Sequence, residues 1–111
     1  MTNTQTPIVE RTLLAQEADG REWPMTIRLW APTQSDQMPW ACVLEVTELF
    51  SPAKPIYGED SWRALQLALR FTASLLEGFR SKAGRIYWPY DEGEGQRFEL
   101  EPHELLPRLP A

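Results

Sequence analysis

Residues 60–82 read DSWRALQLALRFTASLLEGFRSK, and they decide the fold because they form the longest periodic stretch in the chain. Their polar side chains recur at spacings of three and four residues, which predicts a helix with one narrow polar stripe. These side chains belong to Arg63, Gln66, Arg70, Ser74, Glu77 and Ser81. The remaining positions are mostly apolar or small, an arc wider than one sheet face usually covers. We therefore expect this helix to form the centre of the core, with room for cover on two sides.

Both ends of the predicted helix carry capping signals. Asp60 or Ser61 is a suitable N-cap, because a side-chain oxygen there accepts a hydrogen bond from a free backbone N–H of the first turn. Basic residues gather at the other end, where they suit the negative end of the helix dipole, and Gly84 is a natural stop. The helix is therefore expected from about Asp60 to Lys82.

Three extended segments precede the helix. Residues 8–16 alternate imperfectly between apolar and polar side chains, and residues 25–30 alternate cleanly. The Asp19-Gly20 pair between them is a tight-turn signal and predicts a hairpin. Residues 40–50 are predicted as a third strand.

Prolines punctuate the chain after the third predicted strand. Pro52 and Pro55 are expected to end that strand, and Gly58 to turn the chain towards the helix. After the helix, residues 85–88 are predicted as a short strand and residues 96–100 as its partner. This order predicts an α+β fold, with an antiparallel sheet of four or five strands and one long helix packed on one face.

The composition is that of one globular domain. The chain has 111 residues, 42% hydrophobic and 24% charged, which is enough for one core but not for two. We expect a disordered N-terminus over residues 1–7 and a proline-rich tail over residues 102–111. The sequence shows no secretory signal and no apolar run long enough to span a bilayer, so we expect a cytoplasmic protein without membrane association.

The net charge of the chain is concentrated in one segment. Residues 91–104 hold six carboxylates and one base, Arg97, so they alone account for the −5 of the whole chain. A charge localised in this way steers or repels a partner, whereas the same charge spread evenly would mainly confer solubility. Because the sequence pI is about 4.8, we expect no binding to nucleic acid.

Residues suited to nucleophilic catalysis are scarce. His103 is the only histidine and Cys42 the only cysteine, so a single Cys–His pair is conceivable. Cys42 falls on the apolar face of the third predicted strand, where a cysteine behaves as a small hydrophobe. We therefore expect a buried, inert thiol and a protein that is not an enzyme.

The predicted turn over residues 91–95 clusters acids between glycines, which invites a calcium interpretation. It lacks the alternating ligands and the distal Glu of an EF-hand loop, and its glycines suit a hairpin turn equally well. No glycine-rich phosphate loop is present either. We expect neither a metal nor a cofactor.

An aromatic cluster, Tyr87-Trp88-Pro89-Tyr90, borders the acidic turn. Strand alternation sends Tyr87 and Trp88 to opposite faces, so one of the two rings is expected to point away from the helix. An outward ring either covers sheet surface or anchors a partner, as aromatic residues do at interface hot spots.

Four short motifs within residues 8–88 carry a resemblance. They are Glu10-Arg11-Thr12, Asp19-Gly20, Tyr57-Gly58-Glu59-Asp60 and Ala64-Leu65-Gln66-Leu67-Ala68-Leu69. In their order they resemble a group of small uncharacterised bacterial domains. The resemblance implies an α+β fold and a bacterial origin, and it carries no functional residue.

These features predict a non-catalytic protein-binding module. We expect an acidic C-terminal surface that contacts a basic toxin or enzyme, as an immunity protein or another inhibitor does. The expected contact residues are Trp88, Tyr90, Asp91, Glu92, Glu94, Glu99 and Glu101. The sequence leaves two alternatives open: a homodimeric secretion chaperone that uses the wide apolar arc of the helix, and a small enzyme.

Overall fold

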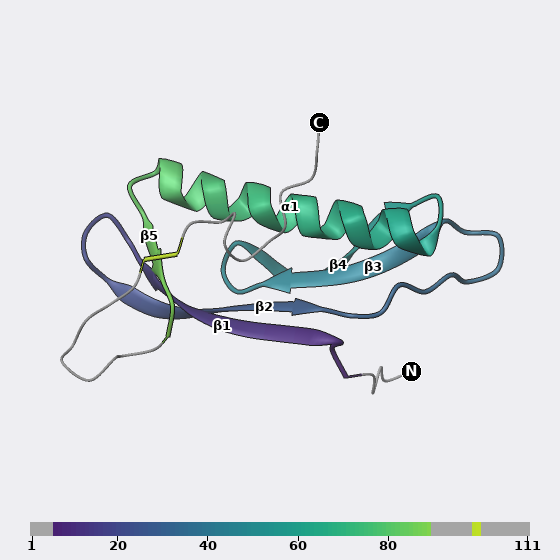
Figure 1. The fold of residues 1–111 in the computed structure, drawn as a ribbon, viewed down its shortest axis with the longest axis horizontal. Coiled ribbons are helices and arrows are strands. Elements are labelled where there is room, and N and C mark those ends of the chain that lie inside the picture. The colour runs from purple at the N-terminus through teal and green to yellow at the C-terminus, as the bar shows by residue number, and fades with distance from the viewer. Residues whose placement is uncertain (1–5, 90–98, 101–111) are drawn as a thin grey trace.

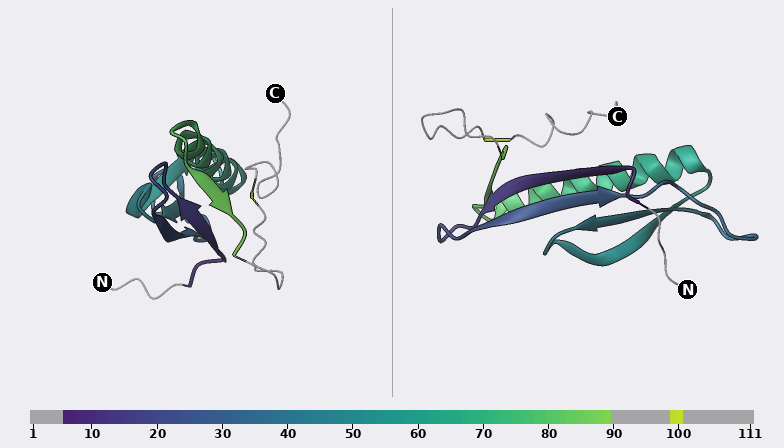
Figure 2. Two further views of the ribbon diagram at one scale, coloured as in Figure 1. Left: turned by 90° about the vertical axis from the view of Figure 1, so that its left-hand side faces the viewer. Right: turned by 90° about the horizontal axis from the view of Figure 1, so that it is seen from below.

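One antiparallel sheet and one helix make up the computed structural model, which describes residues 6–89 and 99–100 (Figure 1). The elements are β1 (Val9–Gln16), β2 (Glu22–Leu29), β3 (Trp40–Val46), β4 (Phe50–Gly58), α1 (Ser61–Ser81) and β5 (Arg85–Tyr87). The five strands pair in the order β4-β3-β2-β1-β5, and α1 lies on one face of this sheet (Figure 2). The predicted α+β class is confirmed.

The helix lies mainly over the half of the sheet that contains β4 and β3. It contacts β4 and β3 and, to a smaller extent, β5, which follows it in the chain. Because β4 ends the strand order among the described residues, one flank of α1 lies beside a sheet edge that none of them covers with a further strand. The boundary between α1 and β4 is therefore accessible to solvent.

The segment after β3 corrects the prediction of one strand over residues 40–50. β3 ends at Val46, the chain reverses through Glu48 at φ +68°, and β4 then runs back along β3 from Phe50. Pro52 and Pro55 lie inside β4 and do not end a strand. The prediction was wrong because it treated proline as a strand terminator, although an edge strand tolerates it.

The position of Pro55 explains why the ladder accepts a residue without an N–H. Pro55 pairs with Val43, and the Val43 carbonyl oxygen accepts a hydrogen bond of 3.0 Å from the backbone N–H of Trp30, on the β2 side. Val43 therefore directs its backbone groups away from β4, and antiparallel alternation directs those of Pro55 to the open edge. The missing donor costs the sheet no hydrogen bond.

The start of α1 agrees with the capping prediction. Asp60 is the N-cap, and its Oδ1 accepts a hydrogen bond of 2.7 Å from the backbone N–H of Arg63. Gly58 ends β4 and lies so close to the first turn that a Cβ there would be 2.4 Å from the backbone nitrogen of Ala64. The glycine therefore permits close contact between strand and helix.

The end of α1 differs in detail from the prediction that Gly84 stops the helix. The backbone N–H of Gly84 donates to the Phe79 carbonyl at 3.2 Å, and that of Ala83 donates to the Arg80 carbonyl at 3.0 Å, which is a Schellman motif. The left-handed residue is Ala83, at φ +68°. Gly84 is required for another reason, because a Cβ there would lie 2.5 Å from the Phe79 ring.

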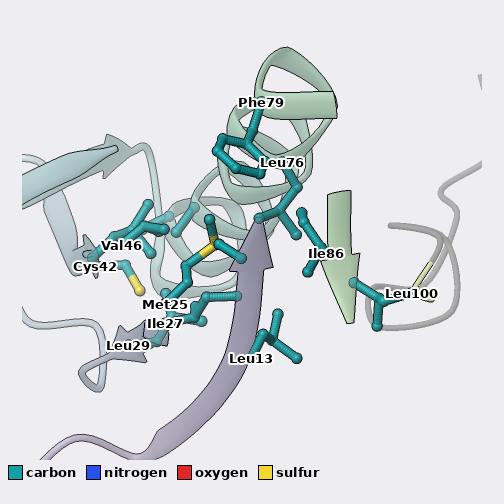
Figure 3. Close-up of a cluster of buried hydrophobic side chains, with 14 residues drawn as sticks. Leu13, Met25, Ile27, Leu29, Cys42, Val46, Leu76, Phe79, Ile86 and Leu100 are labelled. Carbon is teal, nitrogen blue, oxygen red and sulfur yellow. The ribbon is translucent and has the colours of Figure 1, made fainter. Parts of the chain in front are cut away.

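The core lies between the sheet and α1 (Figure 3). Alternate residues of the strands supply Leu13, Met25, Ile27, Leu44 and Val46, and the helix supplies Ala64, Ala68, Leu76 and Phe79. Leu100 is fully buried beside β5, although it lies 13 residues beyond the last residue of that strand. The core is therefore closed by a residue from the C-terminal part of the chain.

The outer face of the sheet is polar at its centre. Arg28 on β2 forms ion pairs with Glu10 on β1 and, at 3.1 Å, with Glu45 on β3. Beside them the hydroxyls of Thr12 and Thr26 are 2.9 Å apart. These cross-strand pairs fit a sheet face that carries no helix.

Of the predicted partner strand over residues 96–100, the structure describes residues 99 and 100, and Glu99 forms an antiparallel bridge with Tyr87. Residues 96–98, the predicted tail over residues 102–111 and most of the predicted N-terminal segment lie outside the described residues.

Candidate functional site

Two of the predicted contact residues, Trp88 and Glu99, belong to the described part of the chain. The other five lie outside it; they are Tyr90, Asp91, Glu92, Glu94 and Glu101. The structure therefore describes Trp88 and Glu99 of the predicted contact surface, and the other five residues stay a sequence-based prediction.

The two aromatic rings of β5 take opposite sides, as alternation predicts. Ile86 is fully buried on the helix side, so Tyr87 faces the outer side of the sheet, beside Leu14 of β1. Trp88 returns to the helix side, packs against the core and is half-buried. The guanidinium carbon of Arg11 lies 4.8 Å from the centroid of its ring, within the range of a cation–π contact.

Glu99 is held against β5 by side chain and backbone. Its Oε1 lies 3.4 Å from Nη1 of Arg85, and its main chain bridges Tyr87. The next residue, Leu100, donates its backbone N–H to the Ile86 carbonyl at 2.7 Å. Pro89 lies two residues after the end of β5, so the described residues on both sides of positions 90–98 lie near the β5 edge of the sheet.

The thiol of Cys42 is buried, as the sequence predicts. Cys42 is fully inaccessible on β3, and its Sγ donates a 3.3 Å hydrogen bond to the Trp30 carbonyl oxygen. Burial raises the pKa of this thiol, because the thiolate would lose its hydration. His103, its conceivable catalytic partner, lies outside the described residues.

Residues 6–89 and 99–100 offer neither a metal-binding cluster nor a membrane-spanning helix. These residues contain no group of three His, Cys, Asp or Glu side chains that could hold a metal ion. They also contain no helix that is long and apolar enough to cross a membrane.

Several large apolar side chains are exposed at one end of the sheet, where β1 and β3 begin, β4 ends and α1 starts. Trp62, in the first turn of α1, is 74% exposed, and Tyr57 at the end of β4 is 52% exposed. Ile8, Val9 and Met38, near the starts of β1 and β3, are each more than half exposed. These side chains contribute little to the core and are available for contact with another molecule.

A groove between α1 and β4 was missed by the sequence-based reasoning. It is lined by Ile56, Arg63, Leu67, Arg70, Phe71 and Ser74. The sequence places Arg63 and Arg70 in the narrow polar stripe of the helix and predicts no strand over residues 50–58, so it gives no sign of the strand that borders the groove. The sequence signal for this strand is the segment from Phe50 to Gly58, in which every second residue, including Lys54 and Ile56, lies on the helix side of the sheet.

The comparisons with known proteins concern the family alone. No curated protein and no solved structure matches the chain. A family model described as a domain of unknown function (DUF6968) matches residues 9–100, from the start of β1 to the buried Leu100. Because this match covers most of the chain, the protein belongs to the DUF6968 family.

Proposed function

We propose that this domain is a non-catalytic protein-binding module, and specifically a bacterial immunity protein or inhibitor that covers a basic surface of its partner. One observation carries the proposal: residues 91–104 alone account for the −5 net charge of the chain. An acidic surface raises the rate of encounter with a basic protein and disfavours other partners.

The attachment of this segment to the fold supports the proposal. Glu99 bridges Tyr87 of β5, and Pro89 lies two residues after that strand, so the residues that precede and follow positions 90–98 lie near the same edge of the sheet. Trp88 and Tyr87 flank the same edge, and both are half-buried. Aromatic side chains beside a charged rim are typical of protein interfaces.

The partner suited to this surface is a basic protein with a cleft that the acidic segment blocks. Immunity proteins are encoded beside their toxins, so the product of the adjacent gene is the first candidate. The experiment mixes the two purified proteins and measures association by surface plasmon resonance at low and high salt. We expect a tight complex whose association rate falls as salt rises, because opposite charges steer the encounter.

A charge-reversal pair locates the binding surface. Glu92→Lys/Glu94→Lys is expected to lower the association rate at low salt by at least about tenfold. The matched control is Glu59→Lys/Glu77→Lys, which changes the net charge equally on exposed positions next to and within α1. Equal losses of association rate in both variants would show that only the net charge matters. An unchanged association rate in Glu92→Lys/Glu94→Lys would show that the acidic surface is not part of the interface.

A further inference from the structure

An open groove of about 480 Å³ lies along the boundary between α1 and the edge strand β4. Its apolar floor is formed by Ile56 from β4 and by Leu67 and Phe71 from α1. Phe71 is 37% exposed, and its ring packs edge-to-face on Phe50 with 4.9 Å between the centroids. The groove thus offers an ordered apolar surface to solvent.

Cations lie beside this floor. Arg63 and Arg70 line the groove from α1, and Lys54 lies on the same face of β4 as Ile56, with its ammonium 4.8 Å from the centroid of the Phe50 ring. Within residues 6–89 and 99–100, no carboxylate forms an ion pair with any of these three cations. Two positive charges therefore line one apolar groove, and a third lies on the same face of the strand that borders it, in a chain whose net charge is −5.

We propose that this groove binds an acidic segment of another protein, in which two carboxylates flank one apolar side chain. Arg63 and Arg70 are seven residues apart on α1, which separates them by about 10 Å along the helix axis. In an extended peptide, side chains four residues apart share a face and lie about 13 Å apart, with one side chain midway between them. The arginine side chains are long enough to span the difference, and the middle side chain meets Leu67.

The backbone of β4 adds a limited contribution. Ala41 on β3 exchanges both of its backbone hydrogen bonds with Thr33, so Tyr57, which pairs with Ala41, directs its N–H and C=O to the open edge. Pro55, two residues earlier, has no N–H to donate there. Because a continuous strand ladder is interrupted at Pro55, side-chain contacts determine recognition and the edge resists pairing with another sheet.

This surface is independent of the proposed acidic interface. It lies beside β4, whereas the acidic segment is attached at β5, on the opposite edge of the sheet. Failure of either proposal leaves the other standing, because their variants are in different elements.

The test uses the full chain and a fluorescein-labelled peptide, Gly-Glu-Ser-Leu-Ser-Glu-Gly, and measures fluorescence anisotropy at low salt. We expect saturable binding below about 1 mM, weakened about tenfold by the Arg63→Gln/Arg70→Gln variant. Arg21→Gln/Lys82→Gln is the matched control, since it removes two exposed cations elsewhere, and it is expected to change the affinity less than about twofold.

Changes in the peptide keep the test valid even if a protein variant folds poorly. Replacing both Glu by Gln, or Leu by Ser, is expected to weaken binding about tenfold in each case. Absence of saturable binding to the intact peptide would overturn the proposal. Competition by inorganic phosphate as strong as that by unlabelled peptide would also overturn it, because the groove would then be an anion site only. Self-association of the protein that Arg63→Gln/Arg70→Gln abolishes would overturn it as well, because the groove would then bind a second copy.

Discussion

At the residue scale, two glycines are explained by close approach between elements. A Cβ on Gly58 would meet the backbone of α1, and one on Gly84 would meet the ring of Phe79. Phe79 cannot move freely, because its ring packs edge-to-face on Trp23 with 5.9 Å between the centroids. The left-handed backbone conformation at the end of α1 is adopted by Ala83 instead, and the Cβ of this residue makes the conformation strained.

Ala83→Gly is expected to stabilise the protein by about 1 kcal/mol, because glycine adopts a φ of +68° without steric cost. The free energy of unfolding from urea denaturation measures the change. Ala73→Gly, in the middle of α1, is the control and is expected to destabilise by about 1 kcal/mol. A loss of stability in Ala83→Gly would contradict the assigned strain.

The Cys42 thiol is expected to resist alkylation in the native protein, because it is fully buried and its pKa is raised. Labelling with iodoacetamide, followed by mass spectrometry, should be slow in buffer and complete in guanidinium chloride. The neutral thiol is favoured by folding, so its contribution to stability is present below the ordinary pKa of 9.0 and decreases as the pH rises above it. Rapid labelling of the folded protein would contradict this placement.

At the element scale, β4 and α1 show how tertiary position overrides local signals. β4 contains two prolines and is still a strand, because at an edge one side of its backbone has no partner to satisfy. α1 follows its local signals closely, with Asp60 at the N-cap and a Schellman motif at the C-terminal end. The helix is thus determined by its own residues, whereas the strand depends on its neighbour.

Asp60→Ala is expected to destabilise the protein by about 1 kcal/mol, because the Arg63 N–H loses the Asp60 carboxylate that it donates to. Thermal unfolding followed by circular dichroism measures the change. Ser61→Ala is the matched control, since Ser61 is the first helical residue and not the cap, and it is expected to shift stability by less than about 0.5 kcal/mol. A larger loss in the control would make Ser61 the effective cap.

At the scale of the whole molecule, the strand order separates the two proposed binding surfaces. The cations beside β4 and the attachment points of the acidic segment at β5 lie on opposite edges of a five-stranded sheet, about 19 Å apart. Residues from the C-terminal part of the chain also complete the core, since Leu100 is fully buried. The folding unit therefore extends to Leu100, in agreement with the family match over residues 9–100.

Leu100→Ala is expected to destabilise the protein by about 3 kcal/mol, because it removes a fully buried side chain and leaves a cavity beside β5. The midpoint of urea unfolding, at an unchanged denaturant slope, measures the loss. Val9→Ala is the control, and because Val9 is 53% exposed, it is expected to cost less than about 1 kcal/mol. Equal effects in the two variants would exclude Leu100 from the core.

The sequence by itself determined the helix, two candidates for its N-cap, the first hairpin, the buried thiol and the location of the net charge. Each depends on residues close together in the chain, where periodicity, capping and turn chemistry act. It also identified the acidic segment as the candidate binding surface, which remains a prediction beyond the described residues.

Only the tertiary structure decided that residues 50–58 form an edge strand, that Arg63 and Arg70 border a groove, and that Leu100 closes the core. The tertiary structure alone also explains Gly58 and Gly84, because the absence of a Cβ at these positions leaves space for Ala64 and Phe79. These features arise from contacts between residues far apart in the chain or in different elements, and no local pattern encodes such distances. Whether a proline breaks a strand or occupies its open edge depends on which strand lies beside it.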